Sequence, residues 1–592
     1  MGAASIAIEP RVSCFHDTCN VYVLHSGQEA VLVDLGDGDV LDHLEELGVE
    51  RVTDVLLTHH HRDQLGGLAR AAAAGIRIWV PPVERELIEG IGERWRRRQT
   101  WNDYDLREDR FSLIEAVPVH GSVPEYRTLV LGDLAVQVLP TPGHTIGSVS
   151  YIVDLDGRTL AFTGDLVYGD GRVWSLAATQ WTYSGAEGWG ATIISAQMVQ
   201  DRRPALLLPS HGDVIDDPEG ALDSLAARMQ RLIDLRLPNR WNVRERLRQP
   251  FDVISPHLLR NRTMFATSYV LLSDTGAALL IDFGYDVTTT AMPTERTARR
   301  TLLWSLDGLR RDHGVTSIEA AIVSHYHDDH VAGLNLLRDV EGAEVWAAEN
   351  VAPVLEGPAN YDLPCLWFDP IDVDRVLPLE QPFTWQEYEL TVYALPGHTR
   401  YASAICFDVD GARILVTGDQ QTDEGARSIL NYQYRNRFVP EDFARGVELY
   451  RRLRPDLLLG GHWLPLAVTD DLLDRLAADS QRLIDLHREL LPPEGLGTEG
   501  FAARIVPYHG TPATTEYRVL VQNPFDRVET ASVRLVLPTG WRAEPAEQEL
   551  ELPAGAEAAA TFTVQTLGPG VFAADVTIGG TRFGQQAEAV VE

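Results

Sequence analysis

The sequence predicts two mixed α/β domains of the same fold, followed by a smaller all-β domain. Three observations support this prediction. Apolar strand-like runs alternate with helical segments up to about residue 490, the landmarks of that stretch occur twice in the same order, and short alternating runs replace them beyond Glu516. With 592 residues, 45% of them hydrophobic and 23% charged, the chain is long enough for three or four domains with their own cores.

The repeat begins with two strand-like runs that end in Asp-x-Gly. Val21 to Gly36 matches Tyr269 to Gly284, which places Asp34 and Asp282 in equivalent positions. A strand followed by histidines comes next in each copy, and PGHT, TGD and a lone histidine follow in the same order, at offsets of 251 to 266 residues. These landmarks are residues 54–68 and 320–334, PGHT at 142–145 and 396–399, TGD at 163–165 and 417–419, and His211 and His462. The chain therefore contains a duplicated domain.

Helices and domain boundaries follow from the same pattern. The periodicity predicts helices over Val40–Leu47, Gly220–Leu235 and Asp471–Leu490, among others. The stretch from Arg240 to Arg260, with two prolines, is the expected joint between the copies. We predict domains over residues 1–245, 246–492 and 493–592.

Composition excludes several classes of function. A formal net charge of −35 repels nucleic acids and anionic membrane surfaces, so we expect neither as a partner. The chain contains no lysine, which excludes Schiff-base and pyridoxal chemistry and the lysine of a P-loop. Four cysteines are too few for a disulfide framework, and buried free thiols are expected. Without a signal sequence or a long apolar segment, the expectation is a soluble, cytoplasmic protein.

The second copy carries a dense cluster of potential metal ligands. Residues 325–330 read His-Tyr-His-Asp-Asp-His at the end of an apolar strand. Residues i and i+2 of a strand point the same way, so His325 and His327 converge on one point, and Asp329 and His330 can serve a neighbouring one. Imidazole and carboxylate are ligands of zinc and similar cations, and His398, Asp419 and His462 would complete two sets.

These motifs resemble those of the metallo-β-lactamase-fold hydrolases, present twice between about residues 10 and 490. The resemblance implies an αββα sandwich with the metals at one edge of the packed sheets. It implies that Asp419 bridges two ions and that Asp329 also orients the attacking hydroxide. In the second copy the implied ligands of the first metal are His325, His327 and His398, and those of the second are Asp329, His330 and His462.

The first copy departs from the motif at one position. Gln64 stands where the family has its last histidine, and an amide oxygen is a weaker zinc ligand than imidazole. The other six positions match, with Asp63 in the place of the catalytic Asp329: His59, His61, Asp63, His144, Asp165 and His211. Three alternatives remain: an active site with one metal, a site for a different metal, and a degenerate copy kept as a scaffold.

The expected function is metal-dependent hydrolysis of a small molecule, centred on the second copy. Two zinc ions there, and one or two in the first copy, would lower the pKa of a bridging water and supply hydroxide near neutral pH. An ester, lactone, amide, thioester or phosphodiester would suit this chemistry. Iron or manganese could occupy the same ligands, so an iron-dependent oxidoreductase is one alternative. A non-enzymatic, metal-stabilised binding module is the other.

Two further segments are candidates for contacts with a substrate. The arginine-rich run from Glu93 to Arg98 is either a lid that recognises an anionic group or a solvated helix face. After each TGD comes an aromatic-rich loop, which either approaches the metals or packs against its own domain. The residues concerned are Trp174, Trp181 and Tyr183 in the first copy, and Tyr432, Tyr434, Arg435 and Arg437 in the second.

The C-terminal region reads as a sandwich of about 80 residues with short alternating runs separated by Pro, Gly and Asn. It resembles the immunoglobulin-like modules attached to some carbohydrate-active enzymes, through Asn523-Pro524-Phe525 and residues 537–541. Sugar binding, docking onto the duplicated domains, dimerisation and structural support are all open roles. A homodimer is the macromolecular assembly we consider.

Overall fold

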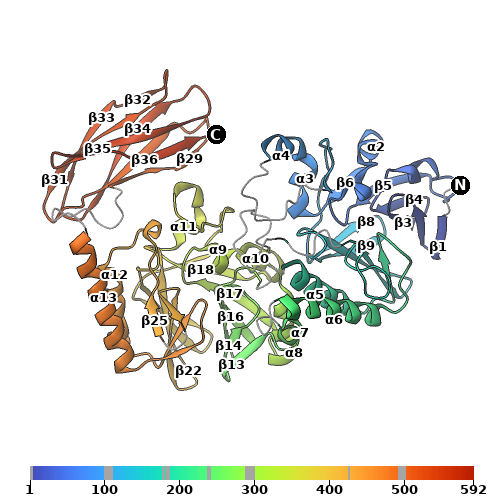
Figure 1. Cartoon of the computed structure of the whole chain (residues 1–592), viewed down its shortest axis with the longest axis horizontal. Helices are drawn as coiled ribbons and strands as arrows, with labels where there is room; N and C mark the ends of the chain where they lie inside the picture. Colours follow the sequence, from blue (N-terminus) through green and yellow to red (C-terminus); the bar gives the residue numbers. More distant parts are fainter. Residues whose placement is uncertain are drawn as a thin grey trace. The chain divides into compact units, whose positions relative to one another are not determined.

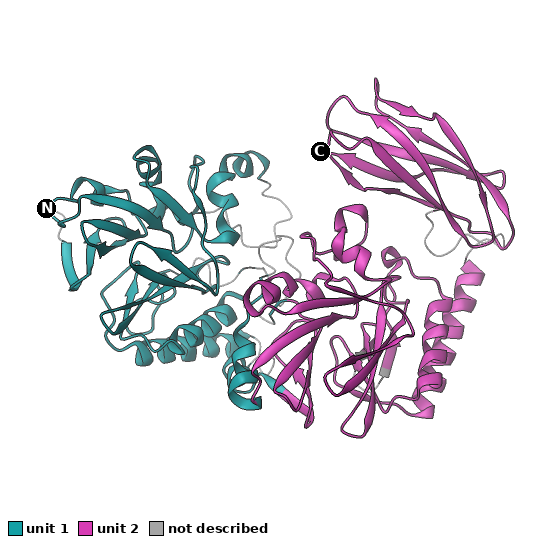
Figure 2. Cartoon of the chain, turned by 180° about the vertical axis from the view of Figure 1, so that it is seen from behind, with its two compact units in different colours: residues 1–251, 285–313 teal, residues 252–284, 314–592 magenta. Residues whose placement is uncertain are grey.

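The computed structural model describes residues 5–98, 111–175, 181, 187–236, 242–286, 300–424, 427–490 and 502–592. The chain forms two compact units (Figure 2). Unit 1 contains Met1–Phe251 together with Tyr285–His313, and unit 2 contains Asp252–Gly284 together with Gly314–Glu592. A segment that follows the Asp-x-Gly motif of the second copy therefore packs in unit 1. The predicted boundary between residues 492 and 493 lies outside the described residues.

Unit 1 is built on two mixed sheets. The first has seven strands in chain order, antiparallel at its start and parallel from β4 onward: β1 (Ser5–Glu9), β2 (Val12–His16), β3 (Asn20–Ser26), β4 (Glu29–Val33), β5 (Arg51–Leu56), β6 (Arg77–Val80) and β7 (Gly121–Ser122). The second has five: β8 (Thr128–Leu131), β9 (Leu134–Pro140), β10 (Val149–Leu155), β11 (Arg158–Gly164) and β12 (Leu206–Pro209).

The helices of unit 1 cover the outer faces of these sheets. They are α1 (Arg62–Leu65), α2 (Leu68–Ala73), α3 (Glu86–Glu89), α4 (Ile91–Arg97), α5 (Glu187–Gln200), α6 (Pro218–Arg236), α7 (Val243–Arg248) and α8 (Trp304–His313). Tyr22 and Leu56 of the first sheet pack against Phe162 of the second, which forms the inner core. α2 packs on the outside of the first sheet, and α5 and α6 lie side by side along the second (Figure 1). The layers are therefore αββα, as predicted.

Unit 2 repeats this arrangement. Its first sheet has seven strands: β13 (Phe251–Ser255), β14 (Leu258–Asn261), β15 (Tyr269–Leu272), β16 (Ala277–Ile281), β17 (Ser317–Val323), β18 (Glu344–Ala348) and β19 (Arg375–Leu377). Its second has six: β20 (Pro382–Trp385), β21 (Tyr388–Ala394), β22 (Ser403–Val409), β23 (Ala412–Gly418), β26 (Leu457–Gly460) and β27 (Leu466–Ala467). A hairpin of β24 (Gln421–Glu424) and β25 (Arg427–Leu430) follows β23. The helices are α9 (Asp328–Val331), α10 (Leu334–Glu341), α11 (Ala352–Glu356), α12 (Glu441–Leu453) and α13 (Asp470–Leu490).

The C-terminal region of unit 2 is all β, as predicted. One sheet consists of β28 (Ala503–Val506), β30 (Glu516–Gln522), β34 (Glu557–Gln565) and β32 (Arg542–Glu544). The other consists of β29 (His509–Gly510), β36 (Thr581–Val591), β35 (Gly570–Ile578), β31 (Glu529–Val536) and β33 (Glu547–Leu552). Tyr517, Phe562 and Phe572 are buried in a core shared by the two sheets. The immunoglobulin-like resemblance stays a prediction.

Two of the three helices named from the sequence are confirmed, and one is not. α6 and α13 cover the predicted ranges almost completely. The stretch Val40–Leu47 forms a short 3-10 helix over Asp39–Asp42, followed by turns. The run is enclosed by Gly38 and Gly48, both with positive φ, so the helical backbone is interrupted close to each end of it.

Two other expectations can be compared with the described residues. None of the four cysteines forms a disulfide. Cys14 and Cys19 are buried as expected, but the expected burial is wrong for Cys365, which lies exposed in a turn, and for Cys406, which is partly exposed. Among the helices of the described part of the chain, none is long and apolar enough to cross a membrane.

Candidate metal centres

The ends of strands bring the predicted ligands of unit 2 to one place. His325, His327, Asp329 and His330 follow β17 of the first sheet, and α9 begins directly after His327. Asp419 follows β23 and His462 follows β26, and because these strands are parallel their ends meet at one edge of the second sheet. Gly461 permits this approach, since a Cβ there would lie 2.0 Å from Asp419 Oδ1.

The ligand atoms of unit 2 form two adjacent groups, each within 4.8 Å. One contains His325, His327, His398 and Asp419, and the other contains Asp329, His330 and His462. Asp419 contacts both, because its Oδ2 lies 3.7 Å from His398 Nε2 and 3.2 Å from His462 Nε2. The structure therefore brings together all seven residues that the sequence predicted for this copy.

The chemistry of these side chains fits cations. Four buried atoms have no hydrogen bond of good geometry within the described residues: His325 Nε2, His327 Nε2, His330 Nε2 and Asp419 Oδ1, of which the last two lie 3.4 Å apart as an ion pair. Leaving such atoms without a partner costs free energy, and a cation would satisfy them. The imidazole and carboxylate donors are those that zinc and similar divalent ions prefer.

Protonation in this centre follows from burial and charge. Burial, helped by the neighbouring imidazoles, lowers the pKa of His327 to about 3, so its ring is neutral. Burial opposes the protonation of His462, but Asp419 and Asp329 outweigh it and raise its pKa to about 10. The same balance with Asp329 and Asp419 raises the pKa of His330. A cation that binds here would displace these protons.

Outer contacts orient the rings. His330 Nδ1 lies 2.8 Å from Asp282 Oδ2, and the Ser324 hydroxyl donates to the same oxygen at 2.6 Å. Because that hydroxyl is used as a donor, it can accept from His325 Nδ1, 3.1 Å away. His398 Nδ1 lies 2.9 Å from the carbonyl oxygen of Asn431. In each ring the Nδ1 proton is held by an acceptor, so the Nε2 lone pair faces the centre.

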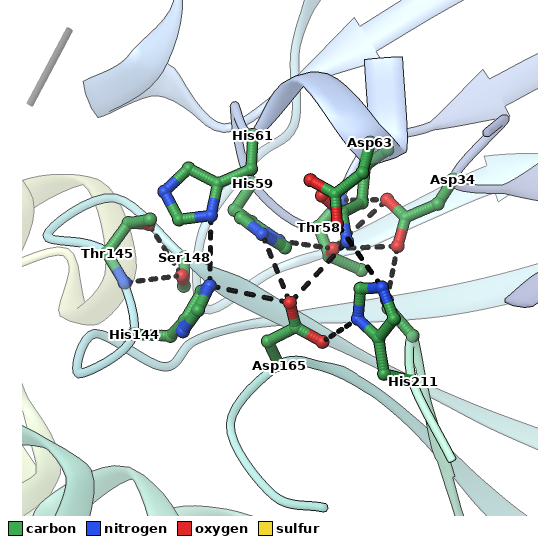
Figure 3. A network of polar contacts seen from close by, with 12 residues as sticks. Asp34, Thr58, His59, His61, Asp63, His144, Thr145, Ser148, Asp165 and His211 are labelled. Atoms are coloured by element: carbon green, nitrogen blue, oxygen red, sulfur yellow. Dashed lines mark hydrogen bonds and ion pairs between the residues drawn. The ribbon is translucent and has the colours of Figure 1, made fainter. Parts of the chain in front are cut away.

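Unit 1 holds a similar centre (Figure 3). His59, His61 and His144 form one group, and Asp63, Asp165 and His211 form a second. His211 Nδ1 lies 2.8 Å from Asp165 Oδ1, and its Nε2 lies 3.2 Å from Asp63 Oδ2. These carboxylates outweigh the effect of burial and raise the pKa of His211 to about 10. All six predicted residues of this copy are therefore close together.

The Gln64 amide distinguishes the two centres. Oriented so that its nitrogen faces acceptors, it donates to Asp63 Oδ1 at 2.8 Å and to the carbonyl oxygen of His61 at 3.2 Å. It is fully buried. Gln64 therefore hydrogen-bonds a potential metal ligand where His330 of unit 2 presents a ring nitrogen.

Two buried carboxylates that support the centre of unit 1 were not among the site residues predicted from the sequence. Asp34 accepts from the Thr58 hydroxyl at 2.8 Å and the Ser210 hydroxyl at 2.6 Å, as Asp282 does from Ser324 in unit 2. The repeated Asp-x-Gly motif was the signal for it. Buried Glu84 accepts from the Thr145 hydroxyl and from the Gly147 N–H, which fixes the loop of His144. No repeated motif marks Glu84.

The weaker predictions have mixed outcomes. The arginine-rich run lies on α4, where Arg96 and Arg97 pair with Glu93 at the surface, as expected of a solvated helix face. Trp174 stacks on His211 with ring centroids 4.4 Å apart, so one aromatic loop does reach a metal centre. Tyr434 packs against Phe438 and His487. Tyr183 lies outside the described residues.

Comparison with known proteins decides the family. The sequence profile of the Metallo-beta-lactamase superfamily matches residues 15–211 and again residues 262–462. The chain belongs to this superfamily. The match to both copies confirms the resemblance seen in the motifs and the tandem duplication of the metallo-β-lactamase fold.

Individual relatives of the superfamily match parts of the chain. The hydroxyacylglutathione hydrolase of Albidiferax ferrireducens is 30% identical over 168 residues, which is 27% of this chain and 52% of that protein. The atrochrysone carboxyl ACP thioesterase of Aspergillus chevalieri is 23% identical over 39% of this chain and 60% of its own length. Among solved structures, a metallo-β-lactamase of Cronobacter sakazakii aligns with a TM-score of 0.31 and 19% identity, over 41% of this chain and 95% of its own. The chain thus spans between half and two thirds of these two relatives.

Proposed function

We propose that this chain is a metal-dependent hydrolase whose main centre lies in unit 2. The observation that carries the proposal is the set of buried Nε2 atoms of His325, His327 and His330, which lack hydrogen bonds among the described residues. His325, His327 and His398 would hold one cation, Asp329, His330 and His462 a second, and Asp419 would contact both. One relative is named as a hydrolase and another as a thioesterase, and both names support hydrolysis.

The chain's own residues prepare this centre. Asp282 and the carbonyl oxygen of Asn431 hold the rings of His330 and His398 in the tautomer that leaves Nε2 free. Bound divalent cations would supply a deprotonated water near neutral pH and positive charge for a developing oxyanion. Asp329, whose Oδ2 lies 3.2 Å from His462 Nε2, would orient the attacking water and accept its proton.

Zinc is the metal that we propose for unit 2, with two ions. In unit 1, His59, His61 and His144 would hold one ion, and Asp63, Asp165 and His211 a weaker second one, with Asp63 in the role of Asp329. The substrate would be a small ester, lactone, amide, thioester or phosphodiester. The relative named as a thioesterase favours thioesters as the first class to assay.

The test combines elemental analysis with a substrate panel. Asp329→Asn should lower kcat/KM by about 10²–10⁴ on any substrate that the metal-loaded protein cleaves, because it removes a positioned acceptor. Asp339→Asn, an exposed change on α10, is the matched control and should leave kcat/KM unchanged.

Two results would contradict the proposal. A metal-loaded protein that is inert on all five substrate classes would favour a metal-stabilised binding module. Iron as the predominant metal, in protein purified without added metal, would favour an iron-dependent oxidoreductase on the same ligands.

A further inference from the structure

A cavity of about 120 Å³ in unit 2 is lined mainly by arginine and tyrosine side chains. Its walls come from the loop after α11, from the loop between β25 and α12, and from the C-terminal sandwich. The residues that matter here are Tyr361, Asp362, Arg435, Arg437, Arg504 and Glu588. The cavity has room for several water molecules, and therefore for a small polar group.

Arg437 is the side chain whose surroundings indicate a ligand. It is half-buried and has a positive φ of 61°, and its guanidinium forms no ion pair or hydrogen bond with the described residues. Arg435 of the same loop, by contrast, pairs with Asp362 at 3.0 Å. A partly desolvated guanidinium without a partner is costly, and a bound anion would compensate for it.

The charges in and around this cavity nearly balance, and three of them are arginines. Three arginines line it against two carboxylates, Asp362 and Glu588. Arg504 of the sandwich is largely buried, with 18% of its side chain exposed, and lies over the ring of Tyr361 at 5.7 Å. Its other contacts are Glu557 at 3.2 Å and the Tyr401 hydroxyl at 3.4 Å. In a chain with a net charge of −35, three arginines around one cavity are a local concentration of positive charge, matched by Asp362, Glu588 and Glu557.

The same loop supports the metal centre. Asn436, between the two arginines, donates its amide N–H to the carbonyl oxygen of His398 at 2.8 Å and accepts from the Tyr326 hydroxyl at 3.3 Å. Tyr326 in turn packs against His327. Asn436, which contacts the His398 backbone and Tyr326, is therefore the sequence neighbour of two arginines that line the cavity.

We propose that this cavity binds the anionic end of the substrate that is cleaved at the unit 2 centre, with Arg437 as its main contact. The inference rests on the proposed hydrolase function and assigns a role to the C-terminal sandwich, which supplies Arg504. A carboxylate or a phosphate would satisfy the guanidinium groups, since both accept paired hydrogen bonds from arginine.

Direct binding tests the cavity without catalysis. Succinate and inorganic phosphate are titrated calorimetrically into the metal-loaded full chain, and the probe that binds identifies the anion. Arg437→Met should weaken the binding about tenfold or more, because it removes a charge-assisted contact of similar length. Arg437→Lys, which keeps the charge, should retain part of the affinity and guards against misfolding of the first variant.

The matched control is Arg451→Met. Arg451 pairs with Asp474 at 2.6 Å between α12 and α13 and is 48% exposed, so this variant should bind both probes like the wild type. Binding of neither probe would overturn the proposal. So would an Arg437→Met variant that is folded and binds as tightly as the wild type.

Kinetics connect the cavity to the metal centre. 4-Nitrophenyl succinate carries a carboxylate on its acyl group, and 4-nitrophenyl acetate does not. The ratio of their kcat/KM values should fall about tenfold in Arg437→Met, and an unchanged ratio would contradict the link to the substrate. If the wild type cleaves neither ester nor any other member of the panel, the hydrolase proposal fails, while the calorimetric result still decides whether the cavity binds anions.

Discussion

At position 64, unit 1 has a buried glutamine where unit 2 has His330. The imidazole of His330 bonds Asp282 on one side and presents its other nitrogen to the centre, whereas the Gln64 amide donates to Asp63. A glutamine side chain can offer a cation only its amide oxygen, a weaker ligand than imidazole, and the N–H donation occupies an oxygen of a proposed ligand. This single residue is the clearest chemical difference between the two centres.

A reciprocal exchange tests that difference. We expect His330→Gln to weaken the second metal of unit 2 by at least about 100-fold, because changes to outer contacts alone cost about 10–100-fold. Gln64→His should strengthen the corresponding metal of unit 1, since Asp34 is in place to orient the new ring. Metal retention against a graded chelator series measures both. An equal retention of metal by all variants would show that position 64 does not distinguish the centres.

The individual ligands were predictable because their types and spacing are local. His325 to His330 lie within six residues, and the repeat supplied the partners at His398, Asp419 and His462. Arg437 was visible only as part of an aromatic-rich loop. The cavity that Arg437 lines also includes Arg504 and Tyr361, which are distant in sequence, so no local pattern could indicate it.

The segment that contains α8 lies within the second copy in sequence but packs in unit 1, which the sequence did not predict. Arg300 is 7% exposed, forms a buried ion pair with Glu125 and donates to the carbonyl oxygen of Ile146 at 2.6 Å. Ile146 lies two residues after His144. An element from between two strands of the second copy thus supports a metal-binding loop of the first.

Loss of this support should be costly. Arg300→Met leaves the buried Glu125 carboxylate without its partner, so we expect unit 1 to lose about 3–5 kcal/mol of stability. Arg310→Met on the same segment is the control, because its pair with Asp307 is 38% and 55% exposed and contributes less than about 1 kcal/mol. Urea unfolding measures both. Similar midpoints for the two variants would contradict the structural role of Arg300.

One carboxylate on the outer face of the sandwich should make the stability of this region depend on pH. Asp575 of β35 is buried and accepts from Arg582 at 2.9 Å and from Arg534 at 2.7 Å, and these hydrogen bonds lower its pKa. A lowered carboxyl pKa stabilises the fold above the unfolded value of about 3.9, and the stabilisation is lost as the pH falls through the folded pKa.

Asp575→Asn should therefore cost about 1 kcal/mol at pH 7, a modest value because both arginines are more than half exposed. The difference from the wild type should shrink as the pH falls below about 4 and disappear only below the lowered pKa of the folded Asp575 carboxyl. Urea-unfolding midpoints at the two pH values measure it, with the exposed Asp526→Asn as the control. A difference that persists at low pH would show that packing, and not charge, is responsible.

The long helices α6 and α13 were predictable from periodicity, because their apolar positions repeat over many residues. The helix predicted over Val40–Leu47 failed since its pattern is short and enclosed by glycines. The transfer of Tyr285–His313 to unit 1 could not be predicted, because it depends on contacts such as that of Arg300 with Glu125 and leaves no local signature.

For the whole molecule, each metal centre joins two sheets. In unit 2 the residues from His325 to His330 follow a strand of the first sheet, while His398, Asp419 and His462 follow strands of the second. A ligand that binds only the folded state at 1,000 times its Kd stabilises it by about 4 kcal/mol. We therefore expect chelation to lower the Tm of the full chain by several degrees.

Calorimetric scans with and without chelator measure this effect. His327→Ala and His61→Ala should each show a smaller shift than the wild type, and the remaining shift reports the contribution of the other unit. Elemental analysis of the same samples should count two ions in unit 2 and at least one in unit 1. A Tm that chelation leaves unchanged would mean that the centres do not hold the sheets together.

The segment Tyr285–His313, which belongs to unit 1, also limits how the chain can be divided into fragments. Because α8 belongs to unit 1 but is encoded between two strands of unit 2, no single cut yields two fragments that each contain a whole unit. A break after Phe251 would leave the first fragment without Arg300 and Leu302, which complete its core and its metal-binding loop. The second copy therefore cannot be removed by truncation without damaging the first unit.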